Sequence, residues 1–476
     1  MEVLDRNISP VHFGFSTEKL QTQVCIIGGG LTGSSLAAFL GRHQIPVVVI
    51  EKEWNEVDRI VGELLQPGGV QQLKNMGMEQ VLNGIDAQPV YGYSIFRKGK
   101  SIQVAYPLGN DFSPGMGFRN GKFVQNIRKL LDELPSVTKI HGNVTELIYE
   151  GEKKISGVKY VTEDGASVQV DATLTVVCDG IFSRFREQLN AERHRVTGFF
   201  AGLVLENVTL PFPSHGHVFI TDQSPFLVYP ITSNSARMLI DFPGDQPPRI
   251  TDDFKSMLKS KLIYHMPEVL RPSFMQAVEE GKIKIMPNHK LNVQPVQING
   301  AVMVGDALNM RHPLTGGGMT VAFTDVYQLG TRLIAHYRDG KFENIDQAVH
   351  DFYSCKSSHT GSVNVLADAL YGVMSDDELS EACFDYLARG GHYASEPVSL
   401  LSAISRNKSL LIRHFFAVAR FGALKKLKQS FSIHALRDAY RMIGRATILV
   451  RPLLLAEKPG WMMKQVLRLS NVIYKS

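Results

Sequence analysis

The sequence predicts an α/β protein with three parts: a Rossmann-like domain, a second domain of mainly antiparallel β-sheet, and a helical C-terminal region. Three observations support this class. A glycine-rich turn lies between two apolar strands near residue 28, two later apolar strands end at Asp-Gly and Gly-Asp, and the patterns after about residue 341 are helical. At 476 residues the chain is long enough for two or three domains.

The first motif has the arrangement of a dinucleotide-binding unit. An apolar strand at residues 24–27 leads into a G-x-G-x-x-G turn made by Gly28, Gly30 and Gly33. A helical pattern and a second apolar strand follow, and that strand ends at Glu51. Glycines let a pyrophosphate approach the helix N-terminus, and an acid at this spacing binds ribose hydroxyls. We therefore expect a bound dinucleotide.

Two further strand ends indicate which dinucleotide it is. Residues 174–186 read LTVVCDGIFSRFR, in which Asp179 follows an apolar strand; a hairpin turn is the structural alternative. In VMVGDALNMRHPLTGGGMTVAF (302–323), Asp306 ends a strand and three glycines open a helix. An acid there suits a ribitol hydroxyl, and the positive helix end suits an anionic ring. The order of the three motifs resembles that of FAD-dependent monooxygenases related to hydroxybenzoate hydroxylase, which favours FAD over NAD.

The FAD-binding domain is expected to be discontinuous. Its predicted pieces are residues 20–90, 121–195 and 285–350, while residues 91–120 and 196–284 form the substrate domain and residues 351–476 the C-terminal helical region. The substrate-domain assignment rests on apolar runs at 93–107, 217–232 and 235–244, which are typical of strands. We expect this second sheet to cover the flavin.

Positive charge is concentrated at the C-terminal end. The chain carries a net +5, yet residues 399–476 hold 15 Lys and Arg against 2 acids, a net of +13, which leaves −8 (36 against 44) for residues 1–398. These basic residues alternate with apolar runs too short to span a bilayer, which predicts a monotopic membrane-binding tail, outside the redox site, on a lipid surface. A helical cap packed on the core is the alternative. Nucleic-acid binding is not expected, because the basic residues do not line a polar groove.

No familiar hydrolytic or metal constellation is visible. The four cysteines are scattered without a CxxC pair, and there is no HExxH motif, so we expect neither a disulfide framework nor a metal site. His312 is the ionisable residue nearest to the glycine-rich helix start, and a structural role in the turn is at least as plausible for it as a catalytic one.

Longer blocks narrow the resemblance to one family. The runs IVGELLQPGG (60–69), FVQNIRK (123–129), VVCDGIFSRFR (176–186) and GDALNMRHPLTGGGMTVAF (305–323) are similar to those of squalene epoxidases, as are runs at 363–371, 387–391 and 397–405. The resemblance covers nearly the whole chain from about Val24. It implies epoxidation of squalene to 2,3-oxidosqualene in sterol biosynthesis, with O2 carried as a C4a-hydroperoxide of non-covalent FAD.

The resemblance also implies an electron source and a location. The chain has a single G-x-G-x-x-G unit, so NADPH would deliver electrons through a partner such as NADPH-cytochrome P450 reductase. The expected location is the cytoplasmic face of the endoplasmic reticulum membrane, where an enzyme docked on the bilayer could take squalene without passing it through water.

Individual residues are assigned by the same resemblance. Tyr93 and Gln66 match a hydrogen-bonded pair beside flavin and substrate, and are the expected catalytic residues. The expected FAD contacts are Gly28, Gly30, Gly33, Glu51, Lys52, Arg59, Arg128, Asp179, Asp306, Gly316, Gly317, Gly318 and Met319. The expected squalene pocket consists of Leu64, Phe219, Phe226, Leu227, Tyr229, Pro230 and Leu314. Leu64 departs from the family pattern, because some members have Phe there.

Two other functions stay open at this point. One is an FAD monooxygenase or reductase that acts on another isoprenoid or an aromatic compound. The other is a carrier that binds prenyl lipids without redox chemistry. The three intact nucleotide motifs argue against the carrier, which has no need to keep all of them.

Overall fold

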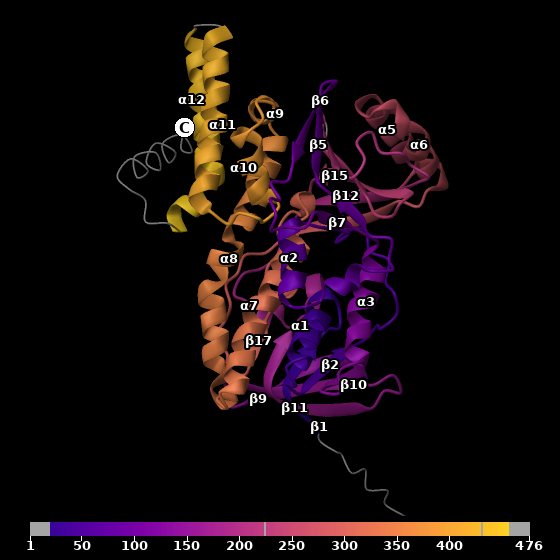
Figure 1. Ribbon diagram of the computed structural model, residues 1–476, viewed down its shortest axis with the longest axis vertical. Helices are drawn as coiled ribbons and strands as arrows, with labels where there is room; N and C mark the ends of the chain where they lie inside the picture. The colour runs from indigo at the N-terminus through magenta and orange to yellow at the C-terminus, as the bar shows by residue number, and fades with distance from the viewer. Residues whose placement is uncertain (1–19, 223–224, 430–431, 457–476) are drawn as a thin grey trace, which may run out of the picture.

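The computed structural model describes residues 20–222, 225–429 and 432–456 (Figure 1). It contains two seven-stranded sheets, one in the lower and one in the upper half of Figure 1, with the C-terminal helices at the upper left. The second sheet is antiparallel at all but one strand pair. The predicted fold class is confirmed.

The first sheet has the strand order β8-β2-β1-β11-β10-β9, and β17 also pairs with β11. The pairings among β8, β2, β1, β11 and β17 are parallel. The strands β2 and β17 and the C-terminal ends of β1 and β11 are apolar and buried, as expected for a parallel sheet covered on both faces, whereas the edge strand β8 is largely exposed. Helix α1 (Leu31–Gly41) packs beside α3 (Asn120–Asp132) and α7 (Gly318–Arg338). The strands are β1 (Leu20–Ile27), β2 (Val47–Glu51), β8 (Val137–His141), β9 (Asn143–Glu150), β10 (Lys154–Val161), β11 (Ser167–Val177) and β17 (Ala301–Met303).

The strand register brings the three sequence motifs to one edge of this sheet. Ile27 lies opposite Ile50 and Val177 in the neighbouring strands, and Val177 lies opposite Met303. The residues that follow these positions are the glycine turn, Glu51, the Asp-Gly turn and the Gly-Asp turn. The carboxyl edge of parallel strands is where α/β proteins bind ligands, so the register alone assembles a candidate site.

The second sheet has the order β16-β12-β15-β14-β13-β5-β6. Helices α5 (Asp252–Leu262) and α6 (Arg271–Glu280) pack against one face, and Thr251 caps the first of them by accepting a hydrogen bond from the Phe254 N–H. The strands are β5 (Gly92–Arg97), β6 (Lys100–Ala105), β12 (Arg195–Glu206), β13 (Gly216–Ile220), β14 (Phe226–Pro230), β15 (Ser235–Pro243) and β16 (Lys284–Lys290). Since β16 pairs with β12, the predicted domain boundary at residue 285 is wrong: this strand belongs to the second sheet.

A small sheet joins the two large ones. It consists of β3 (Leu64–Leu65), β7 (Gly115–Gly117) and β4 (Gln88–Val90), and helix α2 (Pro67–Asn75) follows β3. A Cβ atom on Gly117 would lie 2.0 Å from the Pro230 carbonyl oxygen, so the small sheet packs backbone to backbone on β14. The short helical turns are α4 (Arg186–Leu189), η1 (Glu79–Leu82), η2 (Gly180–Phe182), η3 (Ile263–His265), η4 (Glu268–Leu270), η5 (Gly305–Ala307), η6 (Pro313–Thr315) and η7 (Phe342–Asn344).

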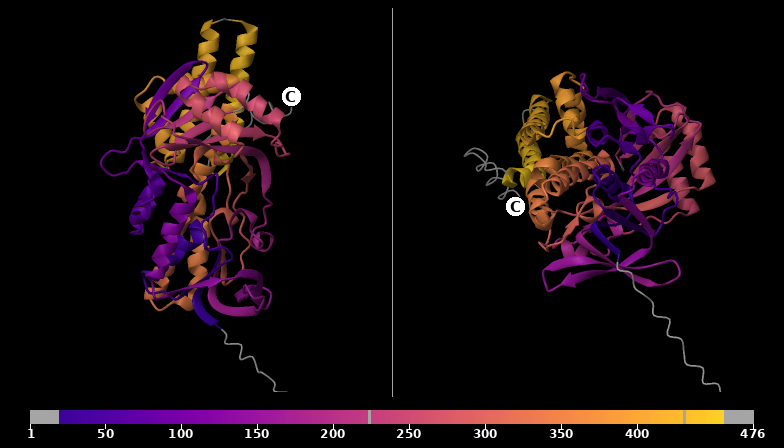
Figure 2. Two further views of the ribbon diagram at one scale, coloured as in Figure 1. Left: turned by 90° about the vertical axis from the view of Figure 1, so that its right-hand side faces the viewer. Right: turned by 60° about the horizontal axis from the view of Figure 1, so that its bottom comes forward.

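The C-terminal region is helical, as predicted. Asp376 caps α9 by accepting hydrogen bonds from the N–H groups of Glu378 and Leu379. Figure 2 shows the last two helices as a hairpin that projects beyond the second sheet. No helix within the described residues is long and apolar enough to cross a membrane. The helices are α8 (Ile345–Met374), α9 (Asp377–Leu387), α10 (His392–Leu401), α11 (Lys408–Gln429) and α12 (Ile433–Ala456), and residues 457–476 of the predicted basic tail lie outside the described residues.

Candidate active site

The glycine turn has the shape that its sequence predicts. Gly28 has a φ of +99°, and a Cβ atom there would lie 2.7 Å from the Cys178 carbonyl oxygen, so only glycine fits. A Cβ atom on Gly33 would lie 1.9 Å from the Gly28 carbonyl oxygen. A Cβ atom on Gly30 would meet nothing within 4 Å. The turn is therefore locked on its inner side and open at the start of α1, where a phosphate could approach.

Glu51 and Arg128 hold the loop beside this turn. Glu51 Oε2 accepts a hydrogen bond from the Gly29 N–H (2.7 Å), and its Oε1 accepts one from the Glu53 N–H (2.9 Å). Arg128 is buried in α3 and donates from Nε to the Gly29 carbonyl (2.8 Å), and from its other nitrogens to the carbonyls of Asn55 (3.1 Å) and Glu53 (3.0 Å). Burial lowers the pKa of Arg128, and the Glu51 charge opposes that shift. Glu51 stays half-buried, so part of its carboxylate surface is free for a ligand.

Arg59 acts electrostatically on both ends of this edge. Its side chain is exposed, and its charge acts both on Arg128, whose pKa it lowers, and on Asp306. A cation in that position could face a pyrophosphate that joins the two ends. Lys52 is exposed too, and its carbonyl lies 2.9 Å from the ring nitrogen Nε2 of His141.

Asp306 follows β17 in a recess. Its side chain is exposed, yet the surrounding protein raises the pKa of the carboxyl through burial, against the opposing effect of Arg311, Arg59 and Arg186. Both facts fit a carboxylate at the bottom of an open hollow. Gly305, with a φ of +66°, packs so closely on α1 that a Cβ atom would lie 2.6 Å from the Thr32 hydroxyl oxygen. This contact fixes the carboxylate relative to the glycine turn.

Arg186 ties the second and third motifs together. It donates to the carbonyl oxygens of Gly180 (2.9 Å) and Ile181 (2.9 Å) on one side, and to those of Ala307 (3.1 Å) and Asp306 (3.3 Å) on the other. Asp179, at the first of these turns, accepts a hydrogen bond from the Arg184 N–H through Oδ2 (2.9 Å), while its buried Oδ1 has no partner among the described residues. Sequence analysis missed Arg186, although it belongs to the FSRFR block that carries the resemblance.

The start of α7 is rich in glycine, and no side chain of the described residues caps its first N–H groups. Gly317 caps the helix, Gly318 and Met319 form its first turn, and that turn contains no acidic residue. The buried hydroxyls of Thr315 and Thr320 have no hydrogen-bond partner in the described part of the chain. Free N–H groups at a positive helix end, two orphaned hydroxyls and the accessible Asp306 carboxylate together fit the flavin and ribityl parts of FAD. The residues present therefore fit this cofactor.

The predicted pair Gln66 and Tyr93 is part of a three-residue network. Gln66 donates from Nε2 to the Tyr93 hydroxyl oxygen (2.6 Å) and to the Thr315 carbonyl (3.0 Å). Its Oε1 accepts a hydrogen bond from the Tyr106 hydroxyl (2.7 Å). All three side chains are buried, and burial raises the pKa of both tyrosines, so both stay protonated. Tyr106 was missed, because nothing in its local sequence separates it from an ordinary strand aromatic.

An apolar pocket begins at Tyr93 and Leu314. Its empty volume, counted together with its open mouth, is about 1110 Å³. Two of its polar side chains bind each other, since Tyr386 Oη lies 2.9 Å from His414 Nδ1, and Glu396 lies 2.7 Å from His414 Nε2. The lining residues are Tyr93, Ile95, Val218, Leu227, Leu314, Leu366, Leu370, Val373, Met374, Leu379, Cys383, Tyr386, Leu387, Pro397, Val398, Leu400, Leu401, Leu411, His414, Phe415, Val418, Ala419 and Ala446.

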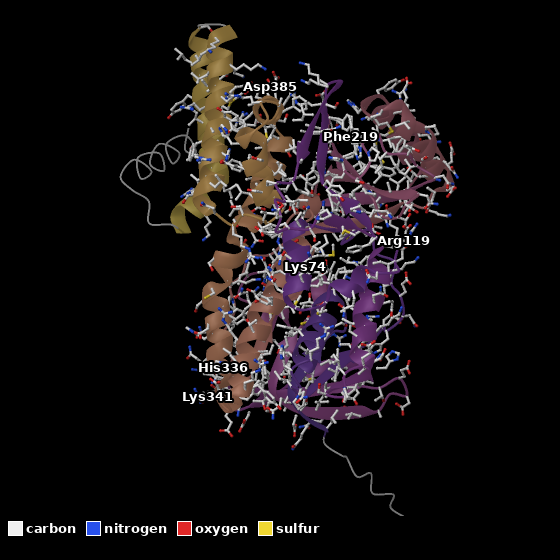
Figure 3. All side chains as sticks on the ribbon, in the orientation of Figure 1. Lys74, Arg119, Phe219, His336, Lys341 and Asp385 are labelled. Atoms are coloured by element: carbon white, nitrogen blue, oxygen red, sulfur yellow. The ribbon has the colours of Figure 1, made fainter. Side chains whose placement is uncertain are left out.

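Some of the predicted pocket residues lie elsewhere. Leu227 and Leu314 line the pocket, and Leu64 and Tyr229 belong to the same apolar cluster without lining it. Pro230 is buried at the contact with Gly117. The assignment of Phe219 and Phe226 is wrong for this pocket: they point to the opposite face of the sheet, toward α5 and α6. Strand residues alternate between faces, so Phe226 and Leu227 point to opposite sides of the sheet. Figure 3, in the orientation of Figure 1, labels Phe219 between β6 and α5.

The largest part of the pocket wall was not predicted at all. Helices α8 to α12 supply most of the lining residues, including Leu411, Phe415 and Ala446. The lining residues on α11 and α12 lie in residues 399–476, the segment that the sequence predicted to be a membrane-binding tail outside the redox site. The expectation of a separate tail is wrong, because α11 and α12 form part of the pocket wall.

His312 has a structural environment. Its Nδ1 accepts a hydrogen bond from the Leu314 N–H (3.3 Å), its Nε2 lies 3.4 Å from the Asp241 carboxylate, and its ring stacks on Tyr371 at 4.0 Å. Both ring nitrogens are thus engaged. The turn-forming role that the sequence left open accounts for this geometry.

Comparisons with known proteins agree with this geometry. The squalene epoxidase family model matches residues 171–439. Squalene epoxidase 3 of Arabidopsis thaliana is 42% identical over 458 residues, covering 94% of this chain and 87% of the plant protein. Squalene epoxidase of Saccharomyces cerevisiae is 36% identical over 434 residues, covering 83% of this chain and 87% of the yeast protein.

Solved structures share the fold at low sequence identity. PqsL of Pseudomonas aeruginosa, a probable FAD-dependent monooxygenase, superposes with a TM-score of 0.65 at 19% identity, covering 77% of this chain and 100% of that protein. The flavin-dependent brominase Bmp2 superposes with a TM-score of 0.66 at 17% identity, covering 82% of this chain and 95% of that protein.

Proposed function

Because the chain belongs to the squalene epoxidase family, we propose that its nucleotide site binds FAD and that its apolar pocket holds squalene against the flavin. FAD-dependent epoxidation of squalene is the function that this membership gives the chain. The residue roles, the electron donor and the location that follow are our proposals.

One observation carries the assignment: the apolar pocket and the nucleotide site share a wall. Gln66 bonds Tyr93, which lines the pocket, and also the Thr315 carbonyl, which directly precedes the glycines at the start of α7. Leu314 lines the pocket one residue before Thr315. An apolar ligand in the pocket would therefore reach the end of α7 at which the flavin fits.

The residues of the nucleotide site would divide the cofactor among them. Glu51 would bind the ribose of the adenosine half, and Arg59 would face the pyrophosphate. Asp306 would bind the ribityl chain, and the first N–H groups of α7 would bind the flavin ring. Asp179 and Arg186 would hold the turns on which these contacts depend.

The bound flavin supplies the activation of O2, and the chain supplies position and dryness. An alkene has no polar handle, so binding must come from apolar area, which the pocket provides. The reaction combines squalene, O2, two electrons and two protons to give the epoxide and water. Tyr93 would act at the boundary, where its hydroxyl, held by Gln66, orients the flavin edge or the alkene.

The electron donor is proposed to be NADPH acting through a reductase, such as NADPH-cytochrome P450 reductase. The chain contains one G-x-G-x-x-G unit, and the first sheet has one set of nucleotide-binding turns within the described residues. A bound nicotinamide domain would need a second set.

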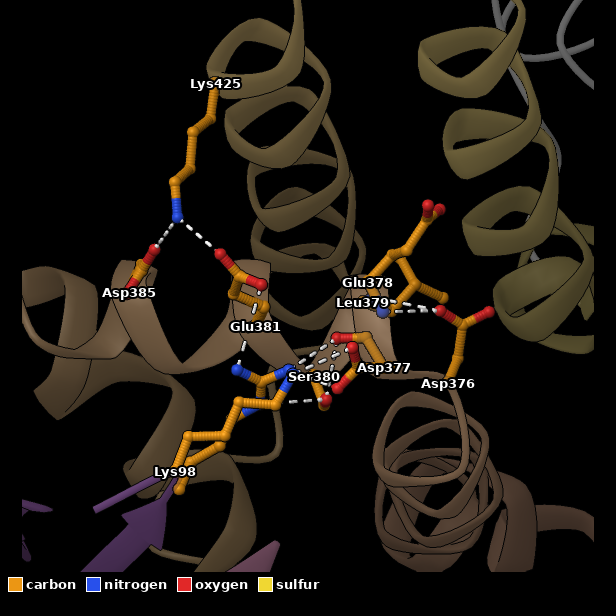
Figure 4. A network of polar contacts seen from close by, with 10 residues as sticks. Lys98, Asp376, Asp377, Glu378, Leu379, Ser380, Glu381, Asp385 and Lys425 are labelled. Atoms are coloured by element: carbon orange, nitrogen blue, oxygen red, sulfur yellow. Dashed lines mark hydrogen bonds and ion pairs between the residues drawn. The ribbon is translucent and has the colours of Figure 1, made fainter. Parts of the chain in front are cut away.

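We further propose that the enzyme docks on the cytoplasmic face of the endoplasmic reticulum through its last helices. Leu424, Leu436, Tyr440 and Ile443 are large apolar residues exposed on α11 and α12. Three basic residues of these helices, Lys425, Lys426 and Arg445, pair with acids at α9, as Figure 4 shows for Lys425, whose Nζ lies 2.7 Å from Glu381 and 2.6 Å from Asp385. Docking would depend on insertion of these exposed apolar residues, with the basic residues that have no partner on α9 facing the head groups.

Product analysis tests the function. The purified protein is incubated with squalene, NADPH, a cytochrome P450 reductase and O2, and the lipid extract is examined for 2,3-oxidosqualene. Flavin absorbance of the purified protein separates an enzyme from a lipid carrier. A yellow protein that converts another isoprenoid but leaves squalene untouched would contradict the substrate assignment.

A further inference from the structure

Arg311 is a buried cation fixed beside the start of α7. Its side chain is only 8% exposed. Nε donates to Asn364 Oδ1 on α8 (2.7 Å), and Nη2 donates to the carbonyl oxygen (3.0 Å) and to Oδ1 (2.7 Å) of Asn309. Asn364 in turn donates to Asn309 Oδ1 (3.0 Å). The guanidinium is thus held in one orientation by two asparagines.

The charge of Arg311 has no anion in direct contact with it. All its hydrogen bonds go to neutral amide groups, and no carboxylate of the described residues forms an ion pair with it. The neighbouring buried lysine, Lys356, differs from Arg311 because it forms a direct ion pair with Asp325. The carboxylates of Asp306, Asp325 and Asp368 act on the guanidinium only from a distance, Asp306 most strongly. A buried charge without an anion in contact is costly, which suggests that a negative group from outside the chain completes the site.

The free edge of the guanidinium points toward the glycines. Nη1 has no hydrogen bond to any described residue, and it lies 3.8 Å from the position that a Cβ atom would take on Gly318. The same helix end carries the free N–H groups of the first turn and the orphaned hydroxyls of Thr315 and Thr320. The Arg311 guanidinium and the N-terminus of α7 therefore both place positive charge beside Gly318.

We infer that Arg311 stabilises the negative charge that reduction places on the flavin ring, and so sets how readily this enzyme accepts electrons. The inference rests on the proposed FAD site. Two-electron reduction with uptake of one proton leaves one negative charge on the flavin ring, and a positive group near the ring favours that state. Asn309 and Asn364 are positioning residues, because they hold the guanidinium without facing the ring.

The prediction concerns the bound flavin itself, so it can be tested without squalene. The full chain carrying FAD is prepared as wild type and as Arg311→Gln. The midpoint potential is measured anaerobically against a reference dye, and the affinity for sulfite, whose adduct also places negative charge on the ring, is measured by loss of flavin absorbance. We expect Arg311→Gln to weaken the reduced relative to the oxidised state at least tenfold, about 30 mV for a two-electron couple, and to weaken sulfite binding in the same direction.

Two further variants make the test specific. Arg406→Gln removes another partly buried arginine that contacts α7 at the Thr324 hydroxyl (3.4 Å), away from the helix start, and should leave the potential unchanged. Asn364→Asp keeps Arg311 in place but sets a carboxylate against its Nε. Asn364→Asp should also lower the midpoint potential. If Arg311→Gln does not bind flavin, Asn364→Asp provides the test in its place.

The outcomes are distinguishable. A wild-type chain that binds no flavin would contradict the proposed function. A flavin-bound Arg311→Gln protein with the wild-type potential and sulfite affinity would overturn the role of Arg311 while leaving the FAD site intact. An equal shift in Arg406→Gln would likewise overturn it, because the effect would then not depend on the helix start.

Discussion

The nucleotide site and the apolar pocket are built in opposite ways, although they share a wall. The nucleotide site consists of turns that follow adjacent parallel strands, and its working groups are backbone N–H groups, carboxylates and arginines. The pocket has walls from the second sheet and from helices α8 to α12, and its working surface is aliphatic. The first site is specified by short motifs and the second by long-range packing, so substitutions should affect them differently.

The largest expected effect is on the nucleotide site. Asp306→Ala should lose most of its flavin, because it removes a contact to a charged group that is worth roughly 1.5–3 kcal/mol, or about 10- to 150-fold in affinity. The apoprotein should be as stable as wild type or more so, since burial raises the pKa of this carboxyl and so disfavours its charge. Flavin absorbance after dilution gives the measurement, with Leu227→Ala in the pocket as the control that keeps flavin. Full absorbance in Asp306→Ala would place the acid outside the site.

The second prediction concerns how the stability of the second sheet, which forms one wall of the pocket, depends on pH. Burial among aromatic rings lowers the pKa of His217 to about 4, against about 6.5 in an unfolded chain. The unfolded state therefore takes up the proton first as pH falls, so stability is present above pH 6.5 and is lost between about 6.5 and 4. The loss should reach up to about 3 kcal/mol at 1.36 kcal/mol per pKa unit.

Urea unfolding at a series of pH values measures this loss. His217→Phe keeps a ring in the aromatic stack and should flatten the dependence, whereas His265→Gln, at an exposed position of the same domain, should not. An equally steep pH dependence in His217→Phe would assign the effect to other groups.

A smaller effect is expected where the two regions meet. Tyr93→Phe should lower epoxidation tenfold or more, while the structural cost of one lost hydrogen bond is only about 1–3 kcal/mol and flavin content is unchanged. Tyr106→Phe is the matched control, because it removes a hydroxyl from the same Gln66 network but does not line the pocket. Turnover and thermal stability of both variants are compared at saturating squalene. Equal losses of turnover would mean that only the network matters, and unchanged turnover in Tyr93→Phe would make it a core residue.

The smallest effect concerns the exposed side of α11 and α12, which we propose faces the membrane. Leu436 is 49% exposed on α12, and Leu436→Ser should weaken binding to anionic vesicles about fivefold, or roughly 1 kcal/mol of apolar insertion. High salt should release little of the wild-type protein, because insertion is not screened. Tyr264→Ser, at an exposed aromatic residue distant in sequence, serves as the control in vesicle flotation. Release of the wild-type protein by salt alone would contradict insertion.

The turns of the proposed nucleotide site could be predicted because a short motif at a strand end marks each of them. Gly28 and Gly33 are required by the close approach of a backbone carbonyl, and Gly305 by the close approach of the Thr32 side chain. The strand register then brings these strand ends together. Arg186 and Arg311 escaped notice because their partners are backbone carbonyls and side-chain amides, which leave no pattern in the sequence.

The pocket was predicted poorly for the converse reason. Apolar strand residues such as Phe219 and Leu227 have the same pattern, and only the packing of α5 and α6 on one face decides which of them reach the cavity. The basic character of residues 399–476 suggested a separate tail, whereas Lys425 and Lys426 face acids of α9 and Ala446 lines the pocket. Charge composition alone could not show these partners.

The position of α11 and α12 in the chain gives the enzyme an order of assembly. A ribosome makes the chain from its N-terminus, and domains fold as their residues emerge. The last element of the nucleotide site, α7, ends at Arg338, whereas the pocket wall is complete only when Ala446 on α12 has been made. A nascent chain can thus fold around its flavin roughly a hundred residues before it can enclose a lipid. The part of the chain that would bind the flavin is therefore synthesised first, and the helices that complete the pocket, α11 and α12, follow it.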